Sequence, residues 1–181
     1  KETIALFSNQ HVLEWGQRSR VTNRRHRVKR KDLLDRNHIG NQVFIEPDLL
    51  SKVGGFDERV GSWQDYELWF RILQDENLQM ERVTEATYVL DMSHPHERIT
   101  DLAPKKRFET LRIMKEKYNL TDPEYNALKV QCCNFAKVSP SLVDLLRKFF
   151  YRPNLGNAEM LIKLFIKSRI YRWPKINDAM K

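Results

Sequence analysis

Asp65 is the side chain in this sequence whose type and position best suit catalysis. It opens a segment, Asp65 to Arg71, whose apolar residues recur at helical spacing, and it follows a turn built on Gly54-Gly55. A carboxylate in the first turn of a helix is stabilised by free backbone N–H groups and by the helix dipole. Such a residue is commonly a helix cap. A capped carboxylate is also ionised and held in place, which suits a general base acting on a hydroxyl group.

The elements that position this carboxylate are predicted from local patterns. Gly54-Gly55 permits a tight turn that a Cβ would strain, and we expect Phe56 to fill the core beneath it. A helix is predicted from residue 64 or 65 to about residue 76. Glu67 and Arg71 would form an i, i+4 ion pair worth about 0.3 kcal/mol. The apolar face of this helix carries four residues at helical spacing: Tyr66, Trp69, Phe70 and Leu73.

Shorter elements are predicted elsewhere in the first half of the chain. Strands are expected at Thr3–Val12, Gln42–Ile45 and Thr84–Met92, the second of them buried and ended by Pro47. Short helices are expected at Lys31–Arg36 and Asp48–Val53, the latter capped by Asp48. The segment 93–100 is predicted to be a loop because Pro95 suits neither a helix interior nor a central strand.

From Pro104 onward the pattern is helical. After the first helix, others are predicted to begin at Asp122-Pro123 with Asp122 as cap, at Ser139 or Ser141, and at Asn157. We therefore predict an α/β fold of two parts. Residues 1–103 would form a mixed sheet with flanking helices, and residues 104–181 would form a helical region.

The composition limits the function classes. The 181 residues carry a formal net charge of +8, which attracts nucleic acid, anionic lipid or phosphorylated small molecules. No apolar run approaches the ~20 residues that span a bilayer, and no export signal opens the chain. The only cysteines, Cys132 and Cys133, are adjacent, so we predict two small apolar helix residues rather than a disulfide or a metal site. This fits a reducing, cytoplasmic setting.

A dense basic run extends from Arg18 to Lys31 with no acidic residue inside it. It lacks apolar periodicity, so we predict a loop or mobile arm. The run is either a solvated loop or a contact for an anionic partner, and the residues we expect to make that contact are Arg24, Arg25 and Arg27.

Two segments together resemble family 2 glycosyltransferases of the GT-A fold. They are Gly54-Gly55-Phe56-Asp57-Glu58 and Trp63-Gln64-Asp65-Tyr66-Glu67-Leu68-Trp69-Phe70-Arg71. The family carries a Gly-Gly-Phe-Asp-Glu turn, followed by a Glu/Gln-Asp pair that opens a helix of Leu-Trp-x-Arg type. The resemblance covers about residues 1–118 and implies an incomplete GT-A-type sheet, comprising the acceptor side of the enzyme.

The resemblance implies roles for individual residues. Asp65 matches the general base that deprotonates the acceptor hydroxyl in an inverting transfer from a nucleotide sugar. Trp63, Gln64 and Asn37 match the acceptor side, although Asn37 is also an ordinary turn residue. The resemblance further implies a role in making a cell-surface polysaccharide or lipopolysaccharide.

The metal and donor side is only partly represented. His96, His94 and Arg98 resemble a family loop that reaches the metal or the donor diphosphate. A divalent cation, Mg²⁺ or Mn²⁺, is expected in a full-length enzyme because hard cations bridge a leaving diphosphate. This chain has no Asp-x-Asp sequence, so we expect it to be a fragment that lacks the donor-binding half, binds no metal tightly and is inactive alone.

Two other function classes stay open. The Arg-rich run would suit a nucleic-acid-binding module, although no recognised nucleic-acid motif occurs and acidic residues are frequent elsewhere. A membrane-docking module without catalysis is the other class. The segments 145–152 and 160–173 combine apolar and basic residues, which suits either peripheral contact with the inner face of a membrane or ordinary packing on a core.

Overall fold

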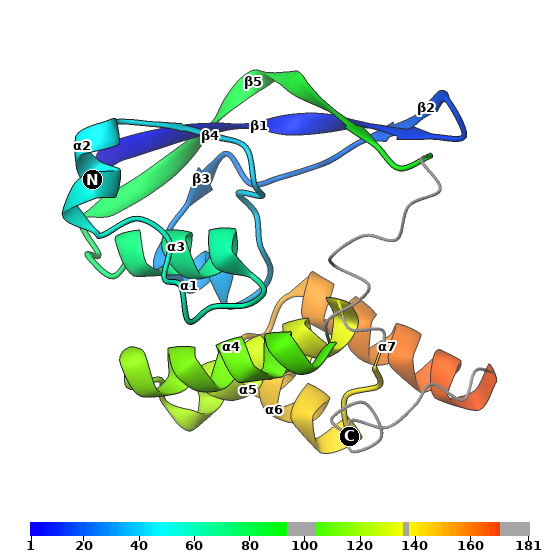
Figure 1. The fold of residues 1–181 in the computed structure, drawn as a ribbon. Helices are drawn as coiled ribbons and strands as arrows, with labels where there is room; N and C mark the ends of the chain where they lie inside the picture. The colour runs from blue at the N-terminus through cyan, green and yellow to red at the C-terminus, as the bar shows by residue number, and fades with distance from the viewer. Residues whose placement is uncertain (94–103, 136–137, 171–181) are drawn as a thin grey trace. The chain divides into compact units, whose positions relative to one another are not determined.

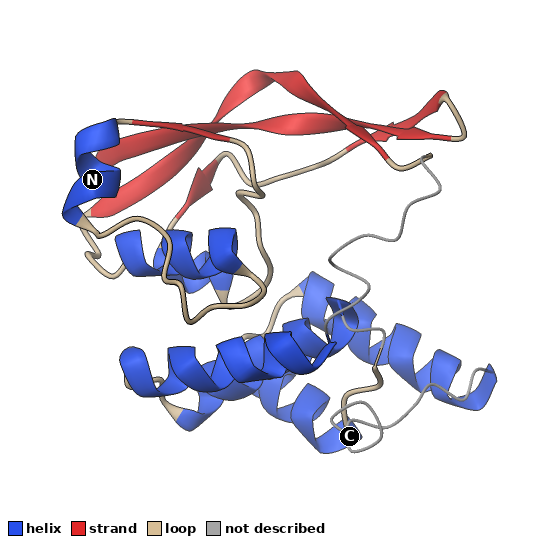
Figure 2. Cartoon of the chain, in the orientation of Figure 1, coloured by secondary structure: helices blue, strands red, loops and turns tan. Residues whose placement is uncertain are grey.

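The computed structural model describes residues 1–93, 104–135 and 138–170, which divide into two compact units. Unit 1 comprises residues 1–33, 37–57 and 64–97, and unit 2 comprises residues 34–36, 58–63 and 98–181. All five strands belong to unit 1 (Figure 2). The predicted mixed α/β class is confirmed. The predicted boundary at residue 103 and the loop expected at 93–100 lie almost wholly outside the described residues.

Unit 1 is built on a mixed sheet of order β2-β1-β5-β3, in which β4 also pairs with β1 (Figure 1). The two long central strands, β1 (Glu2–Glu14) and β5 (Leu78–Asp91), run parallel. The remaining strands pair antiparallel with one of these two: β2 (Gln17–Val21) and β4 (Val43–Ile45) with β1, and β3 (Arg27–Val28) with β5. β5 begins six residues before the predicted strand, because its first residues pair with the start of β1.

The predicted loop over the basic run is wrong in part. Residues 17–21 form β2, an exposed strand joined to β1 by a two-residue turn in which Trp15 and Gly16 both have positive φ, 55° and 76°. Two positive φ values in the turn are typical of a type I′ hairpin. Residues 27 and 28 form β3. The loop was predicted because the run lacks apolar periodicity, whereas pairing with the two central strands gives these residues their structure.

Three short helices complete unit 1: α1 (Arg30–Leu33), α2 (Pro47–Lys52) and α3 (Gln64–Ile72). The α3 residues Tyr66, Trp69 and Phe70 are buried, as predicted, together with Leu73 just beyond the helix. α3 ends at Ile72, four residues before the predicted end. In the turn that follows, the Asp75 side chain accepts a hydrogen bond from the Asn77 N–H at 2.8 Å.

α1 is held against α3. The Tyr66 hydroxyl donates to the Leu33 carbonyl, and the Arg30 guanidinium lies 4.9 Å from the centre of the Phe70 ring.

Several local predictions in unit 1 are wrong. Phe56 is 60% exposed, so it does not fill the core beneath the glycine turn. β4 is not a buried strand, since Phe44 is 76% exposed. Glu46 rather than Asp48 occupies the N-cap of α2, and Pro47 opens that helix because its fixed φ suits the first helical position.

Unit 2 contains four described helices: α4 (Pro104–Lys117), α5 (Asp122–Phe135), α6 (Leu142–Tyr151) and α7 (Leu155–Ile170). Ser141 caps α6 as predicted, accepting from the Asp144 N–H at 3.0 Å. One predicted cap, Asp122, and one predicted helix start, Asn157, are displaced. A Thr121–Glu124 capping box precedes Asp122, with the Thr121 N–H donating to Glu124 at 3.0 Å, and Asn154 rather than Asn157 caps α7. Cys132 and Cys133 are buried free thiols of α5, as predicted.

A polar cluster around Asp35 joins residues far apart in the sequence of unit 2. Both carboxylate oxygens of Asp35 accept from Arg152, at 2.7 and 2.9 Å, and the Lys148 ammonium donates to the Asp35 carbonyl at 3.1 Å. Lys148 is 1% exposed, and burial lowers its pKa to about 8. The Asp35 carboxylate opposes this shift, whereas Arg152 adds to it.

The lowered pKa of Lys148 predicts a measurable dependence of stability on pH. The unfolded chain binds this proton up to about pH 10.5 and the folded chain only to about 8. Lys148 should therefore contribute a rise of about 3 kcal/mol in the free energy of unfolding across this interval. Burial raises the pKa of Cys132 and Cys133, which gives the opposite trend.

The measurement that isolates Lys148 is the difference in unfolding free energy between wild type and Lys148→Met, obtained from urea titrations at several pH values. Both proteins share the cysteines, so their contribution cancels. A difference that stays constant from pH 8 to 10.5 would contradict the prediction.

Candidate functional site

Asp65 lies in the first turn of α3, half-buried, with its carboxylate surrounded by donors. Burial raises the pKa of the Asp65 carboxyl above its ordinary value. The backbone N–H groups of Tyr66 and Asp65, the Arg24 guanidinium and a hydrogen bond from the Asn37 side chain favour the charged form, but they do not outweigh desolvation. The site therefore combines fixed hydrogen bonds with a proton affinity shifted towards neutral pH. A general base benefits from both properties.

The loop from Asn37 to Gly40 is a rigid support for this contact. The Asn37 side-chain oxygen accepts from the backbone N–H groups of Ile39 and Gly40, at 3.0 and 2.8 Å. The indole N–H of Trp69, one turn further along α3, donates to the Gly40 carbonyl at 2.7 Å. The loop that presents Asn37 is therefore tied to the helix that presents Asp65. The two residues that resemblance placed on the acceptor side and at the base are brought together.

Arg24 contacts the same loop. Its guanidinium donates to the backbone carbonyl of Ser8 at 3.1 Å and to that of Ile39. Gly40 has φ of 84°, and a Cβ at this position would come within 2.5 Å of the guanidinium. The positive φ of Gly40 favours glycine at this position, and a Cβ would also displace the Arg24 guanidinium. The positive charge beside Asp65 is held in place by backbone atoms.

A second set of contacts fixes the glycine turn to α3. Arg71 donates to the backbone carbonyls of Val53 and Gly55, at 2.5 and 2.6 Å, and to the Glu67 carboxylate at 3.0 Å. Glu67 is fully buried. The predicted Glu67–Arg71 pair is confirmed, but it is an internal clamp between turn and helix rather than a surface pair. Its contribution is therefore governed by the cost of burying a charge, not by weak surface attraction.

The other two residues expected on the acceptor side, Gln64 and Trp63, differ in exposure to solvent. Gln64 is exposed at the start of α3. Trp63 is buried and has φ of 63°, a left-handed conformation that is rare for a bulky residue and is over-represented at functional sites. The segment that ends at Trp63 belongs to unit 2, where the Ser62 carbonyl accepts from the Thr110 hydroxyl at 2.8 Å.

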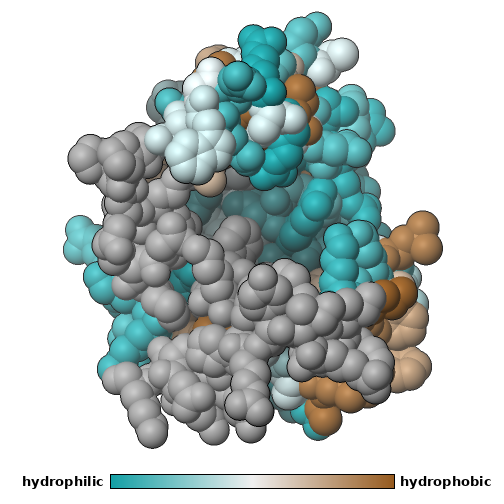
Figure 3. Space-filling model, turned by 90° about the vertical axis from the view of Figure 1, so that its right-hand side faces the viewer, coloured by the Kyte–Doolittle hydropathy of each residue, from teal (hydrophilic) through white to brown (hydrophobic). Residues whose placement is uncertain are grey.

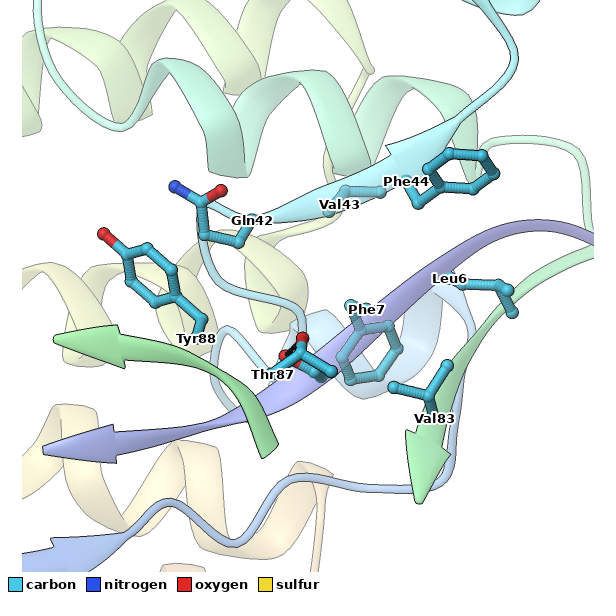
Figure 4. Close-up of a pocket in the computed structure, with 9 residues that line it drawn as sticks. Leu6, Phe7, Gln42, Val43, Phe44, Val83, Thr87 and Tyr88 are labelled. Atoms are coloured by element: carbon cyan, nitrogen blue, oxygen red, sulfur yellow. Dashed lines mark hydrogen bonds between the residues drawn. The ribbon is translucent and has the colours of Figure 1, made fainter. Parts of the chain in front are cut away.

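A pocket of about 410 Å³ lies on the sheet of unit 1, between β4 and the central strands (Figure 4). Gln42 and Tyr88 lie towards one end of it, and Leu6, Phe44 and Val83 towards the other. In its middle the Thr87 hydroxyl donates to the Ser8 hydroxyl at 2.9 Å. Phe7 and Val43 complete the walls. Aromatic and apolar walls with a few convergent polar groups are typical of a small-molecule site.

Asp65 does not line this pocket, but the 37–42 loop connects the two. Its first residue, Asn37, contacts the carboxylate, and its last, Gln42, lines the pocket. Sequence reasoning missed the pocket, because β1, β4 and β5 supply its walls and only folding brings them together. It also missed the place of Arg24 beside Asp65, since nothing in the spacing of residues 24 and 65 connects them.

The three arginines expected to bind an anionic partner all have partners within the protein. Besides the contacts of Arg24, Arg25 pairs with Asp32 at 3.2 Å and Arg27 with Glu81 at 2.8 Å. The latter two remain exposed. His94, His96 and Arg98 lie outside the described residues.

In the described part of the chain, no cluster of three or more His, Cys, Asp or Glu side chains could hold a metal ion. At Asp65 the neighbours are an amide, a guanidinium and backbone N–H groups, all of them hydrogen-bond donors. Hard cations require several oxygen ligands. The groups that act on the Asp65 carboxylate are therefore donors to it and not further oxygen ligands for a cation.

Comparison with protein-family models, with curated proteins and with solved structures finds no match to this chain.

Proposed function

We propose that this chain is the acceptor-side part of an inverting, nucleotide-sugar-dependent glycosyltransferase of family 2, with a GT-A-type sheet and Asp65 as general base. The observation that carries the proposal is the setting of Asp65. The carboxylate lies in the first turn of a helix, hydrogen-bonded by Asn37, beside Arg24, and with a raised pKa. The mixed sheet and the clamp between the glycine turn and α3 support the same proposal.

In the proposed reaction, Asp65 accepts the proton of an acceptor hydroxyl as its oxygen attacks the anomeric carbon of the donor sugar. A bond forms from the acceptor oxygen to that carbon on one face. On the opposite face the bond to the nucleoside diphosphate breaks, and the electron pair leaves with the diphosphate. Attack opposite the leaving group inverts the anomeric configuration. The pocket lined by Gln42, Phe44 and Tyr88 is the space we propose for the rest of the acceptor.

Asn37 acts as a positioning residue in this proposal, and its replacement tests the arrangement. The hydrogen bond from Asn37 favours the charged form of Asp65. Asn37→Ala should raise the pKa of Asp65, so the acid limb of the pH profile of kcat/KM should move to higher pH. The rate on the plateau should fall by about tenfold, since a base that is less well oriented is less effective.

The measurement is sugar transfer by the full-length protein, with the anomeric configuration of the product read by NMR. Asn41→Ala is the matched control, because Asn41 is an exposed residue of the same loop whose side chain accepts from Gln10 at 3.3 Å. Wild type and control should share one pH profile and give the inverted product. A retained configuration would exclude the proposed reaction, and an unmoved acid limb in Asn37→Ala would remove Asn37 from the site.

A further inference from the structure

Helix α6 shows the reverse of the usual arrangement of a surface helix. Its buried residues are Asp144, Leu145 and Lys148, two of the three charged. Lys129 pairs with Asp144 at 2.9 Å, and Lys148 belongs to the Asp35 cluster, so both buried charges have partners in unit 2. The exposed face of α6 is apolar instead: Leu142, Val143, Leu146, Phe150 and Tyr151. A helix of a soluble surface normally turns this face inward.

The apolar face continues into the start of α7. Phe150 is 75% exposed and Leu155 is 90% exposed. Figure 3 shows hydrophobic residues at the surface of the molecule. Six exposed apolar side chains within residues 142–155 are typical of an interaction surface. We call the set of Leu142, Val143, Leu146, Phe150, Tyr151 and Leu155 the α6 face.

The segment that contains the α6 face is basic, as is the run from Arg18 to Lys31. Residues 141–181 contain nine Lys or Arg and three Asp or Glu, a net charge of 9 − 3 = +6, out of +8 for the whole chain. On α6 the one acidic residue, Asp144, is buried, whereas Arg147 is exposed between the apolar side chains. The exposed charge on α6 is therefore positive, and the net charge of the segment, counted from the sequence, has the same sign. Both complement an anionic surface.

We propose that the α6 face docks on an anionic lipid bilayer, with its apolar side chains at the boundary between headgroups and acyl chains. An amphipathic helix with large apolar residues and basic neighbours is the usual element of such contact. Tyr151 and Arg147 suit the interface, since each has an apolar body and a polar end. No described helix is long and apolar enough to cross a membrane. This docking is independent of the proposed sugar transfer.

The test is co-sedimentation of the 181-residue chain with vesicles. One set contains equal amounts of phosphatidylglycerol and phosphatidylcholine, and the other contains phosphatidylcholine alone. We expect binding to the first set at least tenfold tighter than to the second. Phe150→Ser with Leu155→Ser should weaken binding to the anionic vesicles by at least tenfold. Arg147→Ala should weaken it by about fivefold, the effect of one basic residue near an anionic surface.

Matched controls come from exposed residues elsewhere. Phe44→Ser with Phe56→Ser removes two phenylalanines of 76% and 60% exposure from unit 1, and Arg112→Ala removes an exposed arginine of α4. Neither should change binding by more than about twofold, and circular dichroism should report an unchanged fold for all variants. Absence of binding by the wild type would overturn the proposal. So would a Phe150→Ser, Leu155→Ser variant that binds as the wild type does, or control variants that lose binding equally.

Discussion

Replacing Asp65 by Asn in the full-length protein should lower the rate of sugar transfer by about 10²–10⁴-fold, the usual contribution of a general base. The amide has nearly the same shape as the carboxylate and cannot accept the acceptor proton. The loss should appear in kcat, with little change in KM for either substrate. The measurement is steady-state transfer from the preferred nucleotide sugar at saturating acceptor.

Asp48→Asn is the matched control for this change, because Asp48 is an exposed aspartate in the first turn of α2. It should leave the transfer rate within about twofold of wild type. If Asp65→Asn does the same, Asp65 is a helix residue and not the base.

Asp65→Asn should not destabilise the fold. Because burial raises the pKa of Asp65, the folded state binds this proton more tightly than the unfolded state does. The resulting cost to stability is absent below the ordinary pKa of 3.8 and fully present above the raised folded pKa. Asp65→Asn removes this cost, so its Tm at pH 7 should equal or exceed that of wild type. Lost transfer together with unchanged or higher Tm would separate a catalytic role from a structural one.

Replacing Arg71 by Ala should destabilise unit 1 by about 3–5 kcal/mol, the cost of leaving a buried charge without its partner. Glu67 is fully buried beside Arg71, and the carbonyls of Val53 and Gly55 would lose their donor. The glycine turn would no longer be fastened to α3. The free energy of unfolding, measured by urea titration, should fall accordingly.

Arg112→Ala supplies the comparison for this prediction. Arg112 and Glu116 also form an i, i+4 pair, at 3.5 Å, but their side chains are 68% and 69% exposed. Exposed pairs of this kind contribute about 0.3–0.5 kcal/mol. Arg112→Ala should therefore change the unfolding free energy by less than about 0.5 kcal/mol. Similar effects of the two substitutions would show that burial does not set the strength of the Glu67–Arg71 pair.

The sequence predicted correctly those elements whose stabilising contacts lie among residues close together in the chain. The apolar residues of α3 recur at helical spacing, and these side chains are buried as expected. Ser141 caps α6 because a serine oxygen next to a helical segment can accept from its free N–H groups. Cys132 and Cys133 lie buried on a helix, as adjacent small apolar residues should. In each case the determining contacts lie within about one turn of helix.

Predictions failed where distant partners decide the outcome. β5 extends back to Leu78 because the start of β1 is available to pair with it. The basic residues of β2 form a strand because β1 lies beside them. Phe56 was expected in the core, but its neighbours in sequence do not determine which side chains fill the space beneath the turn.

The sequence by itself determined that a carboxylate would open α3 after a glycine turn, and that an ion pair would connect positions 67 and 71. The tertiary structure alone decided what surrounds them. It places Asn37 and Arg24 at Asp65, buries Glu67 so that Arg71 clamps the turn, and turns the apolar face of α6 outward. Backbone propensity and capping act over a few residues, so they can be inferred locally. Burial and electrostatic environment depend on residues that only folding brings together, and these set the pKa of a carboxyl group and the exposure of a surface.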